Sequence, residues 1–159
     1  MVSSSIFPSV LSPNDVLALG LEIGAGLDTE HQQGMSKDAR LLSFHAHYGS
    51  NPLDMADIWH DLQVGEYEGA SLTEKEKSLK GFRMFLMATF YLWAKPKSSM
   101  LLATRFGVCE RYCRGKHLWK WVNKVAALAE KKIRWDEKLS KPDTELFVAS
   151  VDCVDFQYQ

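Results

Sequence analysis

The segment that decides the fold reads Thr73-Glu-Lys-Glu-Lys-Ser-Leu-Lys-Gly-Phe-Arg-Met-Phe-Leu-Met-Ala-Thr-Phe-Tyr-Leu-Trp-Ala-Lys-Pro96. Thr73 and Glu76 have the spacing of a capping box, in which each side chain accepts a backbone N–H of the first helical turn. Lys95-Pro96 ends the pattern, because the residue before proline avoids helical angles. The apolar residues between them recur at the spacing of one helix face: Leu79, Phe82, Leu86, Phe90 and Trp93. We therefore predict a helix that begins at the capping box and buries Phe82, Phe90 and Trp93 in the core.

Three shorter helices are expected before this segment. The first begins at Asn14 or Asp15 and ends at Gly24 and Gly26. The second covers 38–47, and the third covers 53–62 with its apolar residues at helical spacing. The polar composition of 28–34 indicates a loop.

The charge of the chain is unevenly distributed. The total over 159 residues is only −1, with 46% hydrophobic and 25% charged residues, as in an ordinary globular protein. Residues 1–94 have a net charge of −6, residues 95–141 of +9, and residues 142–159 of −4. Such asymmetry is typical of a face that binds a polyanion. The alternative is a lysine-rich helix surface that only faces solvent.

The basic segment contains a pattern similar to a helix-turn-helix. Gly107 occupies the turn, and Ala103 lies where the two helices would cross. A longer second helix follows, with Leu118, Trp121, Val122, Val125 and Leu128 on one face. Gly115 falls inside this predicted helix, at a cost of roughly 1 kcal/mol relative to alanine. Any tight helical hairpin with a glycine turn would give the same pattern.

Six cations of this segment are the candidate DNA-binding residues. Those early on the second helix are expected to meet base edges, and those further along are expected to meet phosphates. They are Arg105, Arg111, Arg114, Lys116, Lys120 and Lys124.

Residues 145–155 form a short apolar and β-branched run that predicts a buried strand. Asp152 lies near its end, and an aspartate held by a strand is a suitable ligand for a catalytic metal ion. Asp155 falls on the opposite face of a continuous strand. The alternative is an aspartate that makes only a local backbone hydrogen bond at the strand end.

The remaining signals are weaker. Cys109, Cys113 and His117 share one face of a helix and suggest zinc, but a structural site needs a fourth ligand. A total of three cysteines argues for a reducing compartment and against a disulfide framework. We expect no membrane span and no signal peptide, since the sequence has no apolar run of about 18 residues and no basic-then-apolar start.

Several of these pieces together resemble the N-terminal part of Harbinger-like DDE transposases. The resemblance runs from about Leu79 to Asp155 through Phe82 to Trp93, Leu101 to Val108, Leu118 to Leu128, Lys132 to Trp135 and Phe147 to Val154. That family places a helix-turn-helix before a ribonuclease-H-like nuclease domain, whose first catalytic aspartate ends the first strand. Asp152 matches that aspartate. The glycine that follows it in the family is Cys153 here, and Asp155 stands at a histidine position.

The resemblance implies a mainly α chain that ends in the first β-strand of a truncated ribonuclease-H-like domain. We expect a poorly defined helical region over 1–70, a helical region over 71–135 with the helix-turn-helix at about 97–130, a linker over 136–144, and the strand within 145–159. The remaining catalytic carboxylates of the family would lie beyond Gln159. A divalent metal such as Mg²⁺ is therefore expected, with Asp152 as ligand, only if a complete nuclease domain exists.

The expected function is DNA binding by a transposase-derived fragment without cleavage activity. One alternative is a helical protein-interaction module whose basic face meets an acidic protein or the acidic first half of the chain. Another is a piece of a complete metal-dependent endonuclease. DNA is the expected partner, with self-association or a missing nuclease portion as further possibilities. A nuclear location follows only from the function.

Overall fold

The computed structural model describes residues 7–128, which form seven α-helices and one turn of 3-10 helix. In chain order they are α1 (Pro13–Ala25), α2 (Thr29–Gln33), α3 (Lys37–Tyr48), α4 (Pro52–Val64), α5 (Leu79–Ala94), α6 (Ser99–Phe106), η1 (Glu110–Cys113) and α7 (Lys116–Ala126). The prediction of a mainly helical chain is confirmed for this part. The predicted linker over 136–144, the strand over 145–159 and Asp152 lie outside the described residues.

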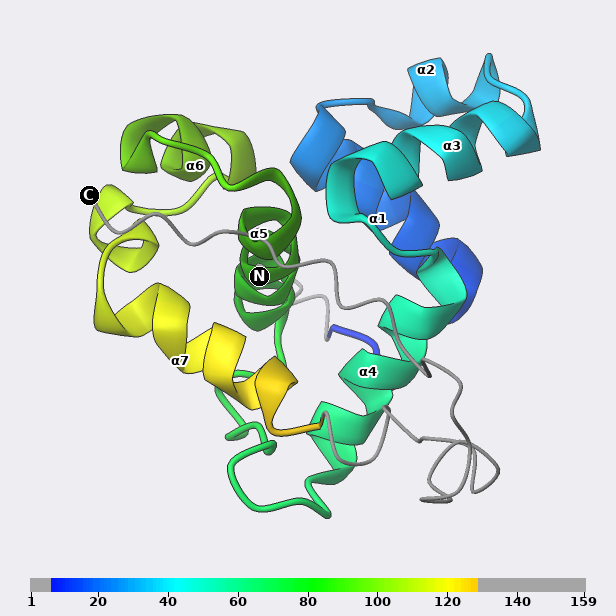
Figure 1. The fold of residues 1–159 in the computed structure, drawn as a ribbon. Helices are drawn as coiled ribbons and strands as arrows, with labels where there is room; N and C mark the ends of the chain where they lie inside the picture. Colours follow the sequence, from blue (N-terminus) through cyan, green and yellow to red (C-terminus); the bar gives the residue numbers. More distant parts are fainter. Residues whose placement is uncertain (1–6, 129–159) are drawn as a thin grey trace, which may run out of the picture. The chain divides into compact units, whose positions relative to one another are not determined.

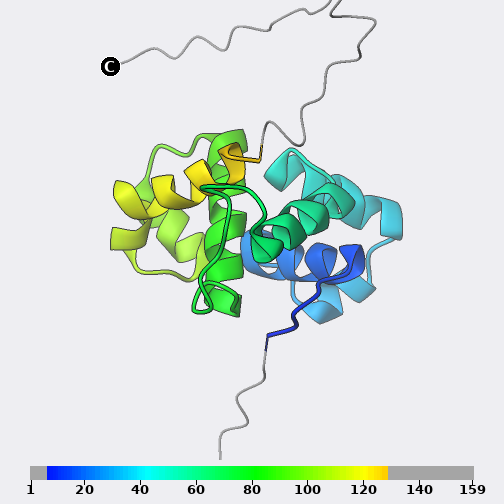
Figure 2. The ribbon, with the colours of Figure 1, turned by 90° about the horizontal axis from the view of Figure 1, so that it is seen from below.

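Helix α5 lies between α1–α4 on one side and α6 and α7 on the other (Figures 1 and 2). Its Phe82 and Phe85 are fully buried. Trp59 of α4 packs against them, with ring centroids 5.2 Å from Phe82 and 5.4 Å from Phe85. Trp59 also stacks on Trp121 of α7 at 6.3 Å. One core therefore joins the helices before and after residue 70. The boundary between the predicted regions 1–70 and 71–135 does not divide this core.

The start of α5 differs from the sequence prediction. Glu76 does accept the Thr73 backbone N–H at 3.2 Å, which is one half of the predicted capping box. However, residues 73–77 form turns, and α5 begins only at Leu79, where the hydroxyl of the preceding Ser78 accepts the Gly81 N–H at 3.3 Å. The reason is a close approach of backbone to backbone. A Cβ at Gly81 would lie 1.7 Å from the Glu76 carbonyl oxygen, so the chain folds back against α5 at this glycine.

The burial predicted for Trp93 is wrong, whereas Phe82 and Phe90 are buried as expected. The Trp93 side chain is 54% exposed. Its indole N–H donates to the Ala46 carbonyl oxygen at 3.1 Å, and its ring covers Gly49 at the end of α3. A tryptophan can follow the apolar spacing and still lie at the rim, because its polar N–H needs a partner.

The loop predicted over 28–34 instead contains the short helix α2 (Thr29–Gln33). Asp28 caps α2 by accepting the His31 N–H at 2.9 Å. Gln32 is buried, and its amide donates to the carbonyl oxygens of Ala18 at 3.0 Å and Leu27 at 2.8 Å. These bonds hold α2 against α1.

The predicted helix-turn-helix has a different second half. Gly107 ends α6 in the left-handed conformation, as expected of the turn. The chain then forms η1, and α7 begins only at Lys116. Gly115 is not inside the helix. It precedes α7 with φ 55° and ψ −133°, a region that is open to glycine and costly for other residues.

None of the helices within 7–128 combines the length and the apolar character needed to cross a membrane.

Glycines on α1 allow α3 to pack closely against it. Gly24 was expected to end α1, but it lies inside the helix and the left-handed Gly26 ends it. A Cβ at Gly24 would lie 2.0 Å from the Tyr48 hydroxyl oxygen. That hydroxyl donates to the Gly20 carbonyl oxygen at 2.6 Å. Tyr48 therefore fills the space that a side chain at position 24 would need.

We predict that Gly24→Ala destabilises the protein, although alanine is normally the better helix residue. Displacement of the buried Tyr48 ring should cost about 1–3 kcal/mol. Urea unfolding followed by circular dichroism measures this cost. Gly34→Ala is the matched control, because a Cβ there would meet only ordinary contacts at 3.5 Å. A Gly24→Ala variant as stable as the control would contradict the packing described here.

Candidate nucleic-acid interface

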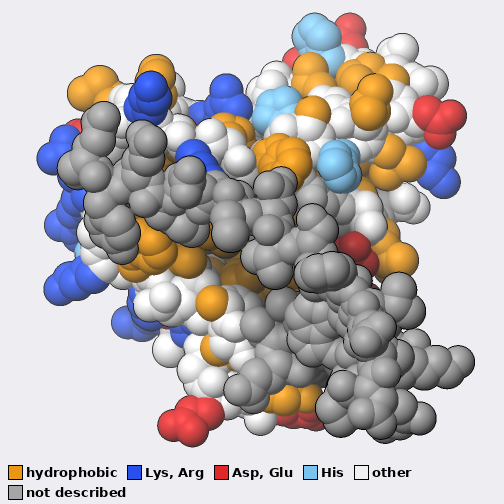
Figure 3. Space-filling model, in the orientation of Figure 1, with side chains coloured by type: hydrophobic (Ala, Val, Ile, Leu, Met, Phe, Trp, Pro, Cys, Tyr) orange, Lys and Arg blue, Asp and Glu red, His pale blue; other side chains and the backbone are white. Residues whose placement is uncertain are grey.

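The charges are divided unevenly between the first and the second half of the described residues. Residues 7–72, which contain α1–α4, carry ten acidic and two basic side chains. Residues 73–128, which contain α5–α7, carry twelve basic and three acidic side chains. Lys and Arg side chains gather along the edge over α6, η1 and α7 (Figure 3). We call this edge, with its residues Arg111, Arg114 and Lys116, the basic edge.

The cations of the basic edge differ in their surroundings. Arg111 and Lys116 are exposed, on η1 and at the start of α7. Arg114 lies in the extended link between them, where it pairs with Glu110 and donates to the Ser99 hydroxyl at 3.3 Å. The prediction that Arg111 and Arg114 lie on the second helix is therefore wrong, and only Lys116 lies early on it. Arg105 of α6 packs its guanidinium 4.7 Å above the Phe90 ring.

Lys120 and Lys124 of α7 are held by one carboxylate. Glu76, in the connection before α5, pairs with Lys120 and with Lys124, the latter at 3.2 Å. Lys124 also donates to the Ser71 carbonyl oxygen. Burial alone raises the pKa of Glu76, but hydrogen bonds from Lys120, the Thr73 backbone and Lys124 outweigh it and leave the pKa below its usual value. Both lysines were predicted to bind phosphates, and both already have an internal anion.

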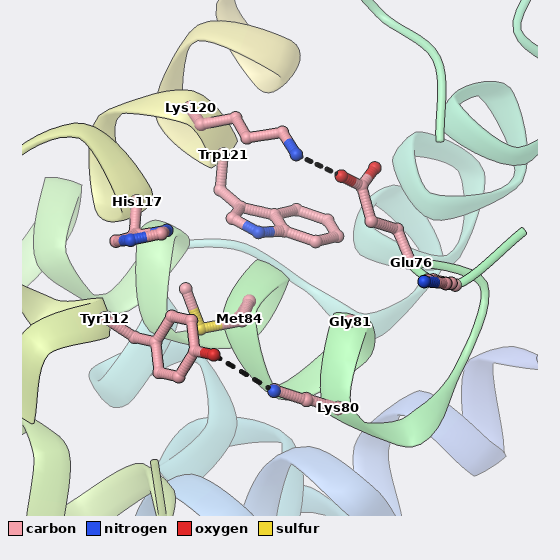
Figure 4. A pocket seen from close by; sticks show the side chains of 9 residues that line it. Glu76, Lys80, Gly81, Met84, Tyr112, His117, Lys120 and Trp121 are labelled. Atoms are coloured by element: carbon pink, nitrogen blue, oxygen red, sulfur yellow. Dashed lines mark hydrogen bonds and ion pairs between the residues drawn. The ribbon is translucent and has the colours of Figure 1, made fainter. Parts of the chain in front are cut away.

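A pocket of about 210 Å³ lies between the connection before α5, α5 itself, η1 and α7 (Figure 4). Met84 and Trp121 supply its apolar surface. Its rim carries five polar side chains besides Glu76: Lys75, Lys80, Tyr112, His117 and Lys120. We call it the lysine pocket.

Tyr112 connects the lysine pocket to the basic edge. The Lys80 ammonium donates to its phenol oxygen at 3.4 Å and lies 4.6 Å from the ring centroid. Arg111 lies over the same ring at 5.3 Å, and His117 meets it edge-on at 5.0 Å. Hydrogen bonding by Arg111 first and Lys80 second lowers the pKa of the Tyr112 phenol, because both cations favour the phenolate. The phenol hydrogen is thus a strengthened donor.

Sequence reasoning did not find the lysine pocket. Lys75 and Lys80 belong to the first 94 residues, whose net charge is negative. Lys80 and Tyr112 are 32 residues apart in the chain, so only tertiary packing brings them together. The charges of residues 75–83, which are basic at four positions and acidic at one, could have indicated a basic site there.

The possible metal sites find no support in the described part. Cys113 is buried, with its thiol 3.4 Å from the Met87 sulfur, and burial raises its pKa. Cys109 is exposed. Within 7–128, no three His, Cys, Asp or Glu side chains gather closely enough to hold one metal ion.

Comparisons with protein-family models, with curated proteins and with solved structures give no significant match. The resemblance to Harbinger-like transposases therefore stays a prediction.

We predict that Glu76→Gln changes how stability depends on pH. A carboxylate whose folded-state pKa lies below its unfolded value stabilises the fold above that unfolded value, and the contribution is lost as pH falls through the folded-state pKa. The wild type should therefore lose this contribution below about pH 4.5, the ordinary value for glutamate. Near pH 7 the variant should be less stable by about 1 kcal/mol.

Urea midpoints measured between pH 3 and pH 7 test this prediction. The variant should show a flatter dependence on pH than the wild type. Glu74→Gln is the matched control, because the Glu74 side chain is 90% exposed and pairs with Lys77, not with Lys120 or Lys124. Parallel curves for the wild type and the Glu76→Gln variant would show that the pairing of Glu76 with the two lysines does not stabilise the fold.

Proposed function

We propose that this chain binds DNA through the basic edge formed by α6, η1 and α7. The observation that carries the proposal is the segregation of charge, with twelve basic and three acidic side chains over 73–128. A duplex carries one negative charge per roughly 1.7 Å of its axis, so it is attracted to such a face and repelled by the acidic α1–α4 side. The charge pattern thus favours a defined orientation on the duplex.

Three features select the residues that would carry the binding. Arg111 and Lys116 are exposed, which leaves them accessible to phosphates. The backbone N–H groups at the start of α7 have no side-chain cap, because Gly115 precedes the helix. An uncapped helix start beside cations is a favourable place for a phosphate. Lys120 and Lys124 contribute less in this proposal, since each would have to exchange Glu76 for DNA.

The choice of DNA among polyanions follows from the resemblance to Harbinger-like transposases. In that reading the described helices are the DNA-binding part of a transposase-derived chain, and the predicted strand with Asp152 follows them. Strand cleavage needs several carboxylates that together hold divalent metal ions, and the proposal for the described helices is DNA binding alone.

A protein-interaction module is the second candidate. The observation that favours it is the pairing of Lys120 and Lys124 with Glu76, which shows internal neutralisation of part of the basic segment. In this reading the acidic first half serves mainly to balance the basic helices. Deletion of 1–70 does not discriminate cleanly, because Phe44 and Trp59 belong to the shared core. Point substitutions on the basic edge do.

We predict that the chain binds a short DNA duplex. The logarithm of the binding constant should fall linearly with the logarithm of the salt concentration. Each phosphate contact contributes about 0.9 to the slope. The double variant with Arg111→Ala and Lys116→Ala should make this slope shallower by about 2 and weaken binding at low salt. Fluorescence anisotropy in a series of NaCl concentrations measures both quantities.

The matched control is Lys37→Ala, which removes a cation from α3 on the acidic side of the protein. It should leave the slope of the wild type unchanged. Absence of binding at low salt, or an affinity that does not respond to salt, would rule out the proposed function and leave the interaction module.

A further inference from the structure

The geometry points to a phosphate monoester as the ligand of the lysine pocket, which would give the protein a preference for DNA ends that carry a terminal phosphate. This inference rests on the proposed function, since the monoester is taken to be the end of a bound strand.

Charge is the first argument. Among the described residues, Lys75, Lys80 and Lys120 line the pocket together with one carboxylate, Glu76, so the described lining carries a net charge of about +2. A phosphate monoester carries about −1.5 to −2 charges at pH 7, whereas a phosphodiester inside a strand carries one. The pocket therefore matches a terminal phosphate better than an internal one.

Hydrogen bonding is the second argument. The Tyr112 phenol oxygen accepts from Lys80 at 3.4 Å, so its own O–H can still donate to a ligand. Lys75 and Lys80 are exposed ammonium groups, each with several donors. In Figure 4 the Lys80 and Tyr112 pair lies on one side of the Trp121 ring, and the Lys120 and Glu76 pair lies on the other. Donors thus surround the opening, as the several acceptor oxygens of a monoester require.

Size and shape are the third argument. A pocket of about 210 Å³ is smaller than the roughly 300–1,000 Å³ of sites for drug-sized ligands. Trp121 is only 4% exposed, so it offers no free face on which a nucleobase could stack. The ligand is therefore a small charged group and not an unstacked base. The apolar Met84 and Trp121 lower the local dielectric and strengthen its attraction to the lysines.

The test compares two duplexes of identical sequence, one with 5′-phosphates and one with 5′-hydroxyl ends, by competition in fluorescence anisotropy. The full chain should bind the phosphorylated duplex roughly tenfold more tightly, as expected for one charge-assisted hydrogen bond. Tyr112→Phe removes the donor without changing the charge, and Lys80→Met removes one ammonium group. Both should bring the ratio close to one, with folding checked by circular dichroism.

Lys77→Met is the matched control. It removes one positive charge from the same connection, but Lys77 pairs with Glu74 and does not line the pocket. It should keep the tenfold ratio. Loss of the ratio in Lys77→Met as well would show a general charge effect and would overturn the assignment of the pocket.

A second measurement separates the sources of the monoester. Ribose 5-phosphate, with ribose as control, is titrated into the protein while the NMR signals of Tyr112 and His117 are followed. Shifts at these residues with ribose 5-phosphate alone, without a preference for phosphorylated ends, support the pocket and assign it to a small sugar phosphate. No shift and no preference overturn the inference.

The two proposals fail in different ways. If the 5′-hydroxyl duplex binds with the expected salt dependence but phosphorylation has no effect, DNA binding stands and the preference for phosphorylated ends is excluded, and the titration with ribose 5-phosphate then decides the pocket. If neither duplex binds, DNA binding is excluded, and the titration with ribose 5-phosphate still decides the pocket.

Discussion

The packing of Trp59 against α5 is the constraint on which the rest of the described structure depends. Its ring contacts Phe82 and Phe85 and stacks on Trp121, so a single side chain of α4 touches both α5 and α7. Helix α5 is apolar on more than one face, and helices must cover it from two sides. The acidic helices lie on one side and the basic helices on the other. The acidic and the basic helices, which the sequence already separates, thus share one core.

Sequence patterns predicted the elements whose apolar spacing is long and regular. Helices α5 and α7 were found in this way, and Leu118, Trp121, Val122 and Leu128 are buried as the spacing of α7 indicates. The sequence predictions are wrong where the backbone geometry, and not the apolar periodicity, determines where a helix begins or ends. The apolar spacing predicts Gly115 inside a helix, but its positive φ separates η1 from α7. A single glycine does not reveal its φ, so the break could not be read from the pattern alone.

The candidate site was less predictable than the fold for a related reason. The exposure of Arg111 and Lys116 agrees with their assignment to a basic surface. The partners of the other cations come from distant parts of the chain, since Glu76 meets Lys120 across 44 residues and Lys80 meets Tyr112 across 32. Local charge counts cannot show which cations are already paired. The lysine pocket is formed by the same long-range contacts, and it was missed for that reason.

Glu76 links the stability of the fold to the availability of its cations. Its carboxylate holds the connection before α5 against α7, and it pairs with two lysines that would otherwise face solvent or a ligand. A polyanion gains little from a cation that must first give up a carboxylate, because the new ion pair replaces an existing one. Exposed cations, in contrast, lose only water and gain the release of counterions from the polyanion. The start of α7 should therefore dominate recognition of a polyanion, while the part of α7 beside Glu76 mainly maintains the fold.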